Sequence, residues 1–133
     1  MVNWIMLNPS TADANKDDPT IRRCIAFSKA WGFKRLTVTN LFAFRATSPK
    51  DLFRAIKPVG PANDEYLTGT ANVADQIVYA WGSQGDFRGR GDEVRHRMRD
   101  VIGKPEIVCL GCTKSGQPRH PLYVPATQER VKW

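Results

Sequence analysis

The chain has 133 residues, of which 41% are hydrophobic and 25% charged, and its formal net charge is +7. This composition is ordinary for a soluble globular protein, and no apolar run approaches the roughly 20 residues that a membrane-spanning helix needs. Because no signal peptide is visible either, we expect a single cytoplasmic domain, residues 1–133, whose positive charge favours a polyanionic partner.

In the first half of the chain, short apolar runs alternate with segments whose apolar residues recur at helical spacing. Asp18 followed by Pro19 is typical of a helix start, since the carboxylate caps the helix and proline lacks only an N–H that the first turn does not use. The pattern repeats at Ser48-Pro49. The predicted elements are a strand at 2–7, a helix from Asp18 to Gly32, a strand at 36–39 and a short helix at 48–56.

The second half continues the alternation of helices and strands. A turn at 58–61 precedes it, and the glycine-rich segment Gly82–Gly91 is predicted to be a flexible loop because glycine is conformationally free. The predicted elements are a helix at 63–74, a strand at 76–80, a basic helix from Asp92 to Ile102, a strand at 107–110, a loop at 111–121 and a short extended tail at 122–124.

The order of these elements indicates the fold class. Strands that are apolar almost throughout are typical of parallel sheets covered on both faces, and helices that alternate with strands supply such covers. The sequence therefore predicts an α/β protein with three layers, α/β/α, around a central four-stranded parallel sheet.

Polar clusters follow each predicted strand. In an open parallel sheet, ligands bind in the crevice outside the carboxyl ends of the strands. The clusters are Asn8-Pro9-Ser10-Thr11, then Asn40, then Trp81-Gly82-Ser83, and finally Lys114–His120. We expect them to converge on one edge of the sheet and to form a binding site there.

Three side chains in these clusters are candidates for chemistry. The amide of Asn8 could orient a water or a ligand oxygen, or it could simply form a turn before proline. His120 lies in a cationic loop and is a candidate for stabilising developing negative charge, although a lone histidine is usually structural. Asp13 is the better general-base candidate, because Asp18 is already explained as a helix cap.

Other residues are candidates for binding. Phe42 and Phe44 follow Asn40 at alternating positions, and either could stack on a base, with packing in the core as the more common role for at least one of them. Trp81 has the same two alternatives. No phosphate-binding loop motif is present. Arg88 and Arg90 in the glycine-rich segment are instead predicted to belong to an arm that contacts a nucleic-acid backbone, and Lys114 and Arg119 are predicted to contact it as well. A solvated basic surface would have the same composition.

The three cysteines are predicted to be structural thiols. Cys24, Cys109 and Cys112 are an odd number for a disulfide framework and fit a reducing compartment. Cys109 and Cys112 have C-x-x-C spacing, but no second pair completes a zinc site. We therefore expect no metal, no iron–sulfur cluster and no other cofactor.

Several segments together resemble one family over almost the whole chain. The segments are MLNPSTAD, DDPTIRRC, VTNLFAFRATSP, VGPAND, AWG and LGCTKSGQPRHPLYV. They resemble a bacterial and phage family known as domain of unknown function 1643, which implies no activity.

A more distant resemblance does imply one. Leu7-Asn8-Pro9-Ser10 is similar to the first motif of the uracil-DNA glycosylase superfamily, Thr39-Asn40 to its base-reading asparagine, and His120-Pro121-Leu122 to a shortened form of its His-Pro-Ser-Pro-Leu loop. The resemblance implies a uracil-DNA glycosylase-like sheet of four parallel strands. It also implies that Asn8 positions water, Asn40 reads the base and His120 stabilises the leaving base. The substrate-binding candidates are Pro9, Ser10, Thr11, Asn40, Phe42, Trp81 and Gly82.

The leading hypothesis is a DNA glycosylase-like protein that hydrolyses the N-glycosidic bond of a modified or mismatched base. Compared with the glycosylase motif that it resembles, the first motif lacks a carboxylate to activate water, and Ser10 stands where that motif has glycine. These departures leave two alternatives open: a non-catalytic nucleic-acid-binding module, and a hydrolase or transferase acting on free nucleotides. In every case the expected partner is DNA or a nucleotide.

Overall fold

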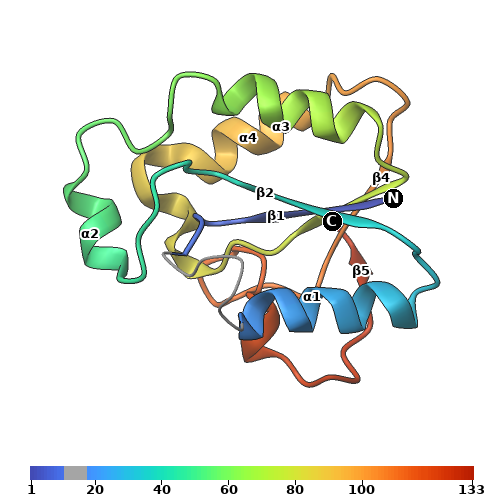
Figure 1. Cartoon of the computed structure of the whole chain (residues 1–133). Coiled ribbons are helices and arrows are strands. Elements are labelled where there is room, and N and C mark those ends of the chain that lie inside the picture. Colours follow the sequence, from blue (N-terminus) through green and yellow to red (C-terminus); the bar gives the residue numbers. More distant parts are fainter. Residues whose placement is uncertain (11–17) are drawn as a thin grey trace.

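One five-stranded sheet forms the centre of the molecule (Figure 1). The computed structural model describes residues 1–10 and 18–133. Along the sheet the strand order is β2-β1-β3-β4-β5. The strands are β1 (Val2–Met6), β2 (Leu36–Asn40), β3 (Gln76–Tyr79), β4 (Glu106–Cys109) and β5 (Val131–Lys132). The first four run parallel, and β5 pairs antiparallel with β4.

The predicted class is confirmed, but the strand count is not. The sheet is a mostly parallel α/β sheet, as expected, and it has five strands instead of four. The fifth consists of Val131 and Lys132, both exposed, so it has no hydrophobic alternation from which it could be predicted. Only its pairing with Val108 and Cys109 makes it a strand.

Helices cover both faces of the sheet. In Figure 1, α1 (Pro19–Ala30) lies on one face, while α3 (Asn63–Asn72) and α4 (Arg90–Met98) lie on the other. Alternate residues of β1 explain this arrangement, since Trp4 packs in the cluster that contains Phe27 of α1, whereas Ile5 packs in the cluster on the opposite face. The three predicted layers are therefore present.

The predicted helix starts at Asp18 and Ser48 are confirmed. The Oδ1 atom of Asp18 accepts hydrogen bonds from the backbone N–H of Thr20 (2.9 Å) and of Ile21 (3.3 Å). Ser48 accepts from the N–H of Lys50 in the same way and begins α2 (Pro49–Arg54). Each cap satisfies a backbone donor that the helix leaves unpaired.

The segment Gly82–Gly91 is not the flexible loop that the sequence predicted. It forms a 3-10 turn, η1 (Ser83–Gly89), that runs directly into α4. A Cβ atom added to Gly85 would lie 1.8 Å from Cδ1 of Trp81, so the glycine is there for close packing against the indole and not for mobility. Accordingly α4 begins at Arg90 instead of Asp92.

Other predicted ends shift by a few residues. The helix α4 ends at Met98 instead of Ile102, and α3 ends at Asn72 instead of Ala74. The tail predicted as extended at 122–124 begins instead with a short 3-10 helix, η2 (Pro121–Tyr123). Its first residue is proline, which favours a helical first turn.

The connections between strands open a crevice at one edge. The chain leaves β1 through α1 on one face, and it leaves the neighbouring strand β3 through η1 and α4 on the other face (Figure 1). Adjacent loops that depart in opposite directions leave a gap at the carboxyl ends of their strands, where doubly wound proteins bind ligands. The short helix α2 lies beyond the same edge.

None of the helices in the described ranges is long and apolar enough to cross a membrane.

Candidate functional site

A cavity of about 510 Å³ occupies the gap between the ends of β1 and β3. This volume is within the range of small-molecule sites, about 300–1,000 Å³. Its walls are the loop after β1, the end of β2, the residues after β3, the start of α1 and the segment before η2. Among the residues lining it are Asn8, Pro9, Ser10, Asn40, Trp81, Gly82, Arg119 and His120. The structure thus brings together most of the residues singled out from the sequence.

Asn8 joins the loop after β1 to the loop after β2. Its Nδ2 atom donates to the carbonyl oxygens of Ala46 (2.9 Å), Pro9 (3.2 Å) and Phe44 (3.4 Å). These bonds engage the nitrogen of the side-chain amide, so the oxygen Oδ1 is the atom through which Asn8 could accept a hydrogen bond from water or a ligand. Asn8 therefore shapes the cavity as well as lining it.

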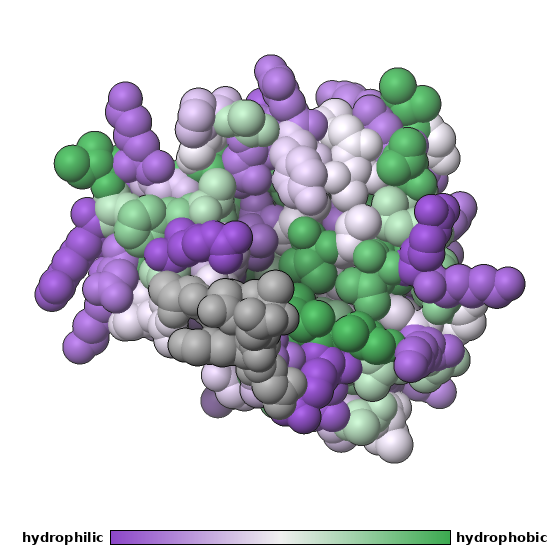
Figure 2. All heavy atoms as spheres, viewed as in Figure 1, coloured by the Kyte–Doolittle hydropathy of each residue, from purple (hydrophilic) through white to green (hydrophobic). Residues whose placement is uncertain are grey.

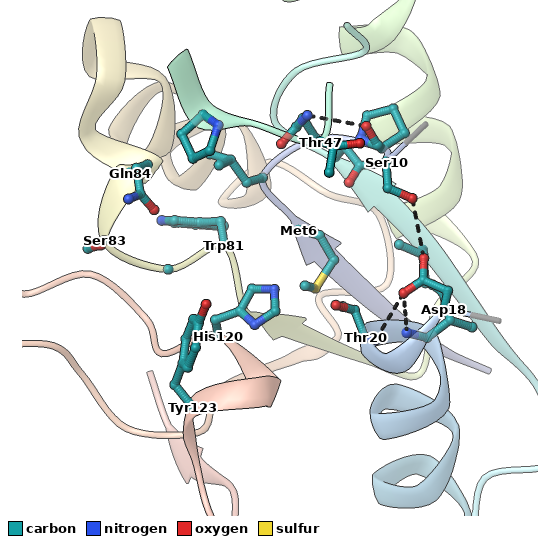
Figure 3. A pocket seen from close by; sticks show the side chains of 18 of the residues that line it. Met6, Ser10, Asp18, Thr20, Thr47, Trp81, Ser83, Gln84, His120 and Tyr123 are labelled. Atoms are coloured by element: carbon teal, nitrogen blue, oxygen red, sulfur yellow. Dashed lines mark hydrogen bonds between the residues drawn. The ribbon is translucent and has the colours of Figure 1, made fainter. Parts of the chain in front are cut away.

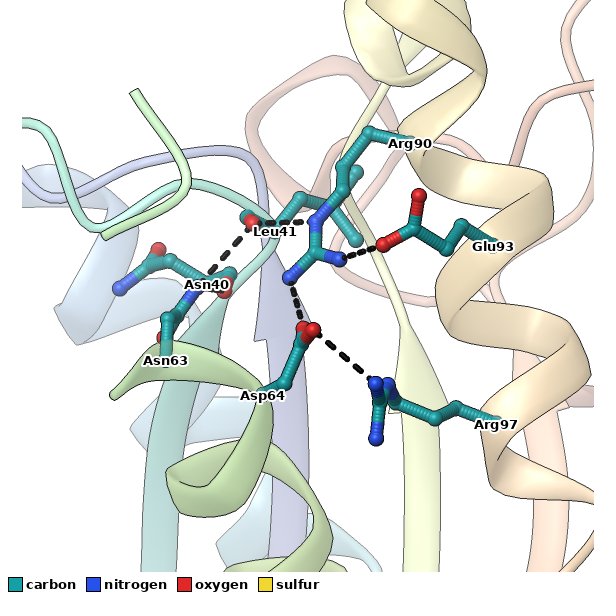
Figure 4. Close-up of polar contacts among 7 residues, drawn as sticks. All are labelled: Asn40, Leu41, Asn63, Asp64, Arg90, Glu93 and Arg97. Atoms are coloured by element: carbon teal, nitrogen blue, oxygen red, sulfur yellow. Dashed lines mark hydrogen bonds and ion pairs between the residues drawn. The ribbon is translucent and has the colours of Figure 1, made fainter. Parts of the chain in front are cut away.

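Asn40 is held at the end of β2 by two helices. The Nδ2 atom of Asn63, in α3, donates to the carbonyl oxygens of Asn40 (2.9 Å) and Leu41 (3.1 Å). Arg90, at the start of α4, donates from Nε to the same Leu41 carbonyl at 2.7 Å (Figure 4). The backbone at the strand end is therefore braced from outside the sheet, which leaves the side-chain amide of Asn40 to line the cavity.

His120 points into the cavity with a defined tautomer. In Figure 3 its imidazole lies between Tyr123 and Met6 and faces the side of the cavity formed by Thr20 and Asp18. Its Nδ1 atom accepts a hydrogen bond from the backbone N–H of Leu122 at 3.1 Å. A nitrogen that accepts carries no proton, so in the neutral ring the proton resides on Nε2, which becomes a donor.

Burial keeps this imidazole neutral. Desolvation lowers the pKa of His120 below its usual value of 6.5, while the carboxylate of Asp18 acts in the opposite direction. Burial disfavours the charged form, and protonation at Nδ1 would also break the bond from Leu122. At neutral pH His120 is therefore a neutral hydrogen-bond donor.

Arg23 braces the segment that carries His120. From α1 it donates through Nε to the carbonyl of Pro121 (3.1 Å) and through Nη2 to that of Val124 (2.9 Å). Tyr123, which is 78% exposed, packs its ring against His120 with centroids 5.4 Å apart. This role of Arg23 could not be predicted from the sequence, because its partners lie about a hundred residues away.

Asp18 lines the cavity while it caps α1. The hydroxyl of Ser10 donates to its Oδ2 atom at 3.5 Å. From the sequence, Asp18 is explained as a helix cap alone. A cap at the start of the helix that follows β1 also lies at the ligand edge, which is why Asp18 lines the cavity. Asp13 and Thr11, the other candidates from this loop, lie outside the described residues.

Trp81 and Gly82 form one wall. The indole of Trp81 is buried and donates from Nε1 to Oε1 of Gln117 at 2.9 Å. Gly82 has φ +81° and ψ −174°, a conformation that is essentially restricted to glycine, and a Cβ on it would come 3.5 Å from the Cβ of His120. Phe42, by contrast, is fully buried against Phe87, so the prediction that it stacks on a base is wrong.

The basic residues separate into three groups. Arg90 is 1% exposed and pairs with Asp64 and Glu93, both at 2.6 Å, so its prediction as part of a nucleic-acid-binding arm is wrong (Figure 4). Arg88 and Lys114 are exposed but do not line the cavity. Arg119 does line it, and so does Arg45, which the sequence did not single out.

The cysteines are free thiols. Cys24 and Cys109 are buried, and burial raises the pKa of Cys109 and raises that of Cys24 to about 12, so neither is a thiolate at neutral pH. Cys112 is exposed. Within residues 1–10 and 18–133, no group of three or more His, Cys, Asp or Glu side chains is arranged to hold a metal ion.

A family model described as "Protein of unknown function (DUF1643)" matches residues 1–122 of the chain. The searches of curated proteins and of solved structures returned no match.

Proposed function

The chain belongs to the DUF1643 family, and because that membership names no activity, we propose from the cavity itself that the protein is a glycosylase-like enzyme. It hydrolyses the N-glycosidic bond of a modified or mismatched base in DNA. The uracil-DNA glycosylase-like motifs motivate this proposal, and the arrangement of Asn8, Asn40 and His120 around one cavity supports it.

The observation that carries the proposal is the state of His120. Cleavage of an N-glycosidic bond leaves negative charge on the departing base, and a donor aimed at that charge lowers the barrier. With Nδ1 occupied by the N–H of Leu122, the neutral ring offers Nε2–H to the cavity. A preorganised neutral donor of this kind suits the stabilisation of an oxyanion on a base.

The remaining steps use the other walls of the cavity. The bond from C1′ to the base nitrogen breaks, its electron pair leaves with the base, and water adds to C1′ and releases a proton to the base or to solvent. Oδ1 of Asn8 accepts a hydrogen bond from this water, and the amide of Asn40 pairs with an edge of the base. Because the transition state resembles an oxocarbenium ion, electrostatic positioning supplies much of the rate acceleration.

Asp18 supplies the negative charge that the first motif lacks. Its carboxylate lines the cavity and acts on His120 from the opposite wall. A negative charge at that point favours the cationic sugar in the transition state. We therefore assign to Asp18 an electrostatic role. The general-base role predicted for Asp13 falls on a residue outside the described ranges.

The test is base release from a panel of DNA single strands and duplexes that contain modified or mismatched bases. Free base is measured by mass spectrometry and abasic sites by alkaline cleavage. Asn8→Ala and His120→Ala should each lower the rate by roughly 10²–10³, as expected for loss of a transition-state hydrogen bond. The matched controls Asn72→Ala and His96→Ala alter the same residue types outside the cavity and should retain the rate.

Two outcomes would count against the proposal. Failure of the wild-type protein to release base across the panel would remove the activity. Equal rates in His120→Ala and His96→Ala would remove the assigned mechanism.

A non-catalytic binding module is the second candidate. One observation favours it: the nitrogen of the Asn8 amide is engaged with three backbone carbonyls, which gives this residue a structural role that needs no chemistry. Such a module would bind DNA with an affinity that falls as salt rises, and it would release no base.

A further inference from the structure

We propose that residues 44–57, the segment that contains α2, form a contact surface for single-stranded nucleic acid. This surface holds the nucleotide next to the one whose base enters the cavity. The inference rests on the proposed function, because it extends the same site outward. It narrows the substrate to a modified base in an unpaired strand, since a mismatched base exists only in a duplex, and it excludes a free nucleotide.

The first observation is a second hollow that adjoins the cavity. It has a volume of about 450 Å³ and is lined by Phe44, Ala46, Asp51, Arg54 and Ala55, and it shares Arg45 and Thr47 with the cavity. The two hollows thus meet along the chain that follows β2. A nucleic-acid strand with one base in the cavity would place the neighbouring nucleotide over the second hollow.

The charge of this segment fits a phosphate backbone. Between residues 44 and 57 there are four basic residues, Arg45, Lys50, Arg54 and Lys57, and a single acid, Asp51. All four basic side chains are exposed. Figure 2 shows hydrophilic side chains, in purple, projecting around α2 at the left of the view. Of the four, Arg45 and Arg54 line the second hollow itself. A segment with this excess of positive charge attracts a polyanion.

An exposed aromatic ring lies among these cations. Phe44, which lines the second hollow, is 40% exposed. Phe53 is 39% exposed, but its ring packs against Phe87 with centroids 4.6 Å apart and does not line the hollow. Aromatic faces interleaved with basic side chains are typical of single-strand-binding surfaces, because every unpaired base has a face that can stack on a ring. In a duplex those faces are already stacked on one another, so the ring of Phe44 selects for an unpaired strand.

The surface is tied to the cavity and held in place. Arg88, from η1, donates to the carbonyl oxygens of Ala55 (2.9 Å) and Ile56 (3.3 Å) at the end of α2. The carbonyl of Phe44 accepts from Nδ2 of Asn8, and the N–H of Phe44 donates to the carbonyl of Pro58 at 3.0 Å. A nucleotide over Phe44 would therefore lie next to the residue proposed to position water.

The experiment measures binding of a short fluorescein-labelled strand of mixed sequence by fluorescence anisotropy over a series of salt concentrations. Separate arms use the strand as DNA, the strand as RNA, the corresponding DNA duplex and a mononucleotide. The variants are Phe44→Ala and Arg54→Gln. Their matched controls are Tyr66→Ala, which removes a ring that is 57% exposed on α3, and Lys29→Gln, which removes an exposed charge in the last turn of α1.

The two variants should change the binding affinity and its salt dependence in different ways. Phe44→Ala should weaken binding about tenfold and leave the salt dependence unchanged, because stacking releases no counterions. Arg54→Gln should weaken binding and also reduce the slope of log K against log salt by about 0.7, the value for one lost phosphate contact on a single strand. The single strand, as DNA or RNA, should bind more tightly than the duplex and the mononucleotide.

Three results would overturn the inference. They are variants that bind as tightly as their controls, a duplex that binds more tightly than the strand, and no binding of the strand. None of them decides the proposed reaction, which is judged by base release in Asn8→Ala and His120→Ala, outside residues 44–57. Loss of base release in those variants, together with unchanged binding in Phe44→Ala and Arg54→Gln, would separate the two ideas.

Discussion

The imidazole of His120 accepts a 3.1 Å hydrogen bond at Nδ1 from the backbone N–H of Leu122. This one contact links the local turn at Pro121 to the chemistry of the cavity, because it decides which ring nitrogen can donate. Together with burial, it favours the neutral form of the ring. Its consequences can be measured without knowledge of the substrate.

The first prediction concerns the pH dependence of stability. Because the pKa of His120 is lower in the folded protein than its usual value of 6.5, the unfolded chain takes up this proton first as pH falls. The contribution of His120 to stability is therefore complete above about pH 6.5 and is lost as pH falls toward the folded pKa. Urea unfolding of the wild type and of His120→Gln should give free energies whose difference shrinks over that window.

For this first prediction, His96→Gln is the control, since His96 is exposed on α4. Wild-type and His120→Gln curves that run parallel between neutral pH and the lower end of the window would show that His120 does not titrate as described.

The second prediction tests the structural role of Asn8. Asn8→Asp keeps the shape of the side chain but turns a carboxylate oxygen toward the carbonyls of Pro9, Phe44 and Ala46, so it should cost about 1–3 kcal/mol in the free energy of unfolding. The control is Asn72→Asp, where the side-chain oxygen accepts from the N–H of Ile102 and an acid can still accept. Urea unfolding at neutral pH should separate the two variants; equal costs would contradict the assignment.

The third prediction concerns the close packing around Trp81. Gly85→Ala would bring a methyl group to 1.8 Å from Cδ1 of the indole, which is buried and held by Gln117. Thermal unfolding should show a loss of at least about 1–3 kcal/mol, together with altered tryptophan fluorescence. Gly69→Ala, in the interior of α3 with no atom within 4 Å of the added Cβ, should instead stabilise by roughly 0.5–1 kcal/mol. A tolerated Gly85→Ala would mean that the segment is as mobile as its composition suggested.

The fourth prediction concerns Arg90. Arg90→Met removes a donor to Leu41 and the partner of Asp64 and Glu93. Those carboxylates are 31% and 57% exposed and the Leu41 carbonyl still accepts from Asn63, so unfolding measured in urea should require about 1–3 kcal/mol less. The matched change Arg99→Met, at an exposed position beyond the end of the same helix, should stay within about 0.5 kcal/mol. Similar effects at the two positions would show that the buried network contributes little.

Some of the site could be predicted from the sequence because it depends on local rules. Apolar runs mark the buried strands, and in a parallel sheet every strand ends at the same edge, so the residues just after the strands must meet there. Asn8, Asn40 and Gly82 follow from that geometry, whereas His120 lies farther along the chain, in the loop after β4. The caps at Asp18 and Ser48 are equally local, since each bonds a backbone N–H two residues ahead.

Other features could not be predicted because their partners are far away in the sequence. Arg90 was interpreted as part of a basic arm, but its ion pair with Asp64 spans 26 residues and its bond to Leu41 spans 49. The glycines near it suggested flexibility, whereas Gly85 is required by an indole that packs on it. From the sequence, Phe42 and Phe44 are equally good candidates for stacking on a base, yet Phe42 is buried and Phe44 is exposed.

The sequence by itself determined the α/β class, the parallel core of the sheet and the edge at which polar groups gather, because hydrophobic periodicity and helix caps act over a few residues. Only the tertiary structure decided which of those groups are available to a ligand. A side chain is available to a ligand when it has no partner elsewhere in the fold. Buried polar side chains almost always have such a partner, since a buried polar group without one is energetically costly. For this reason Arg90 is paired in the interior and is not available to a ligand, whereas Asp18 and Arg45 line the cavity.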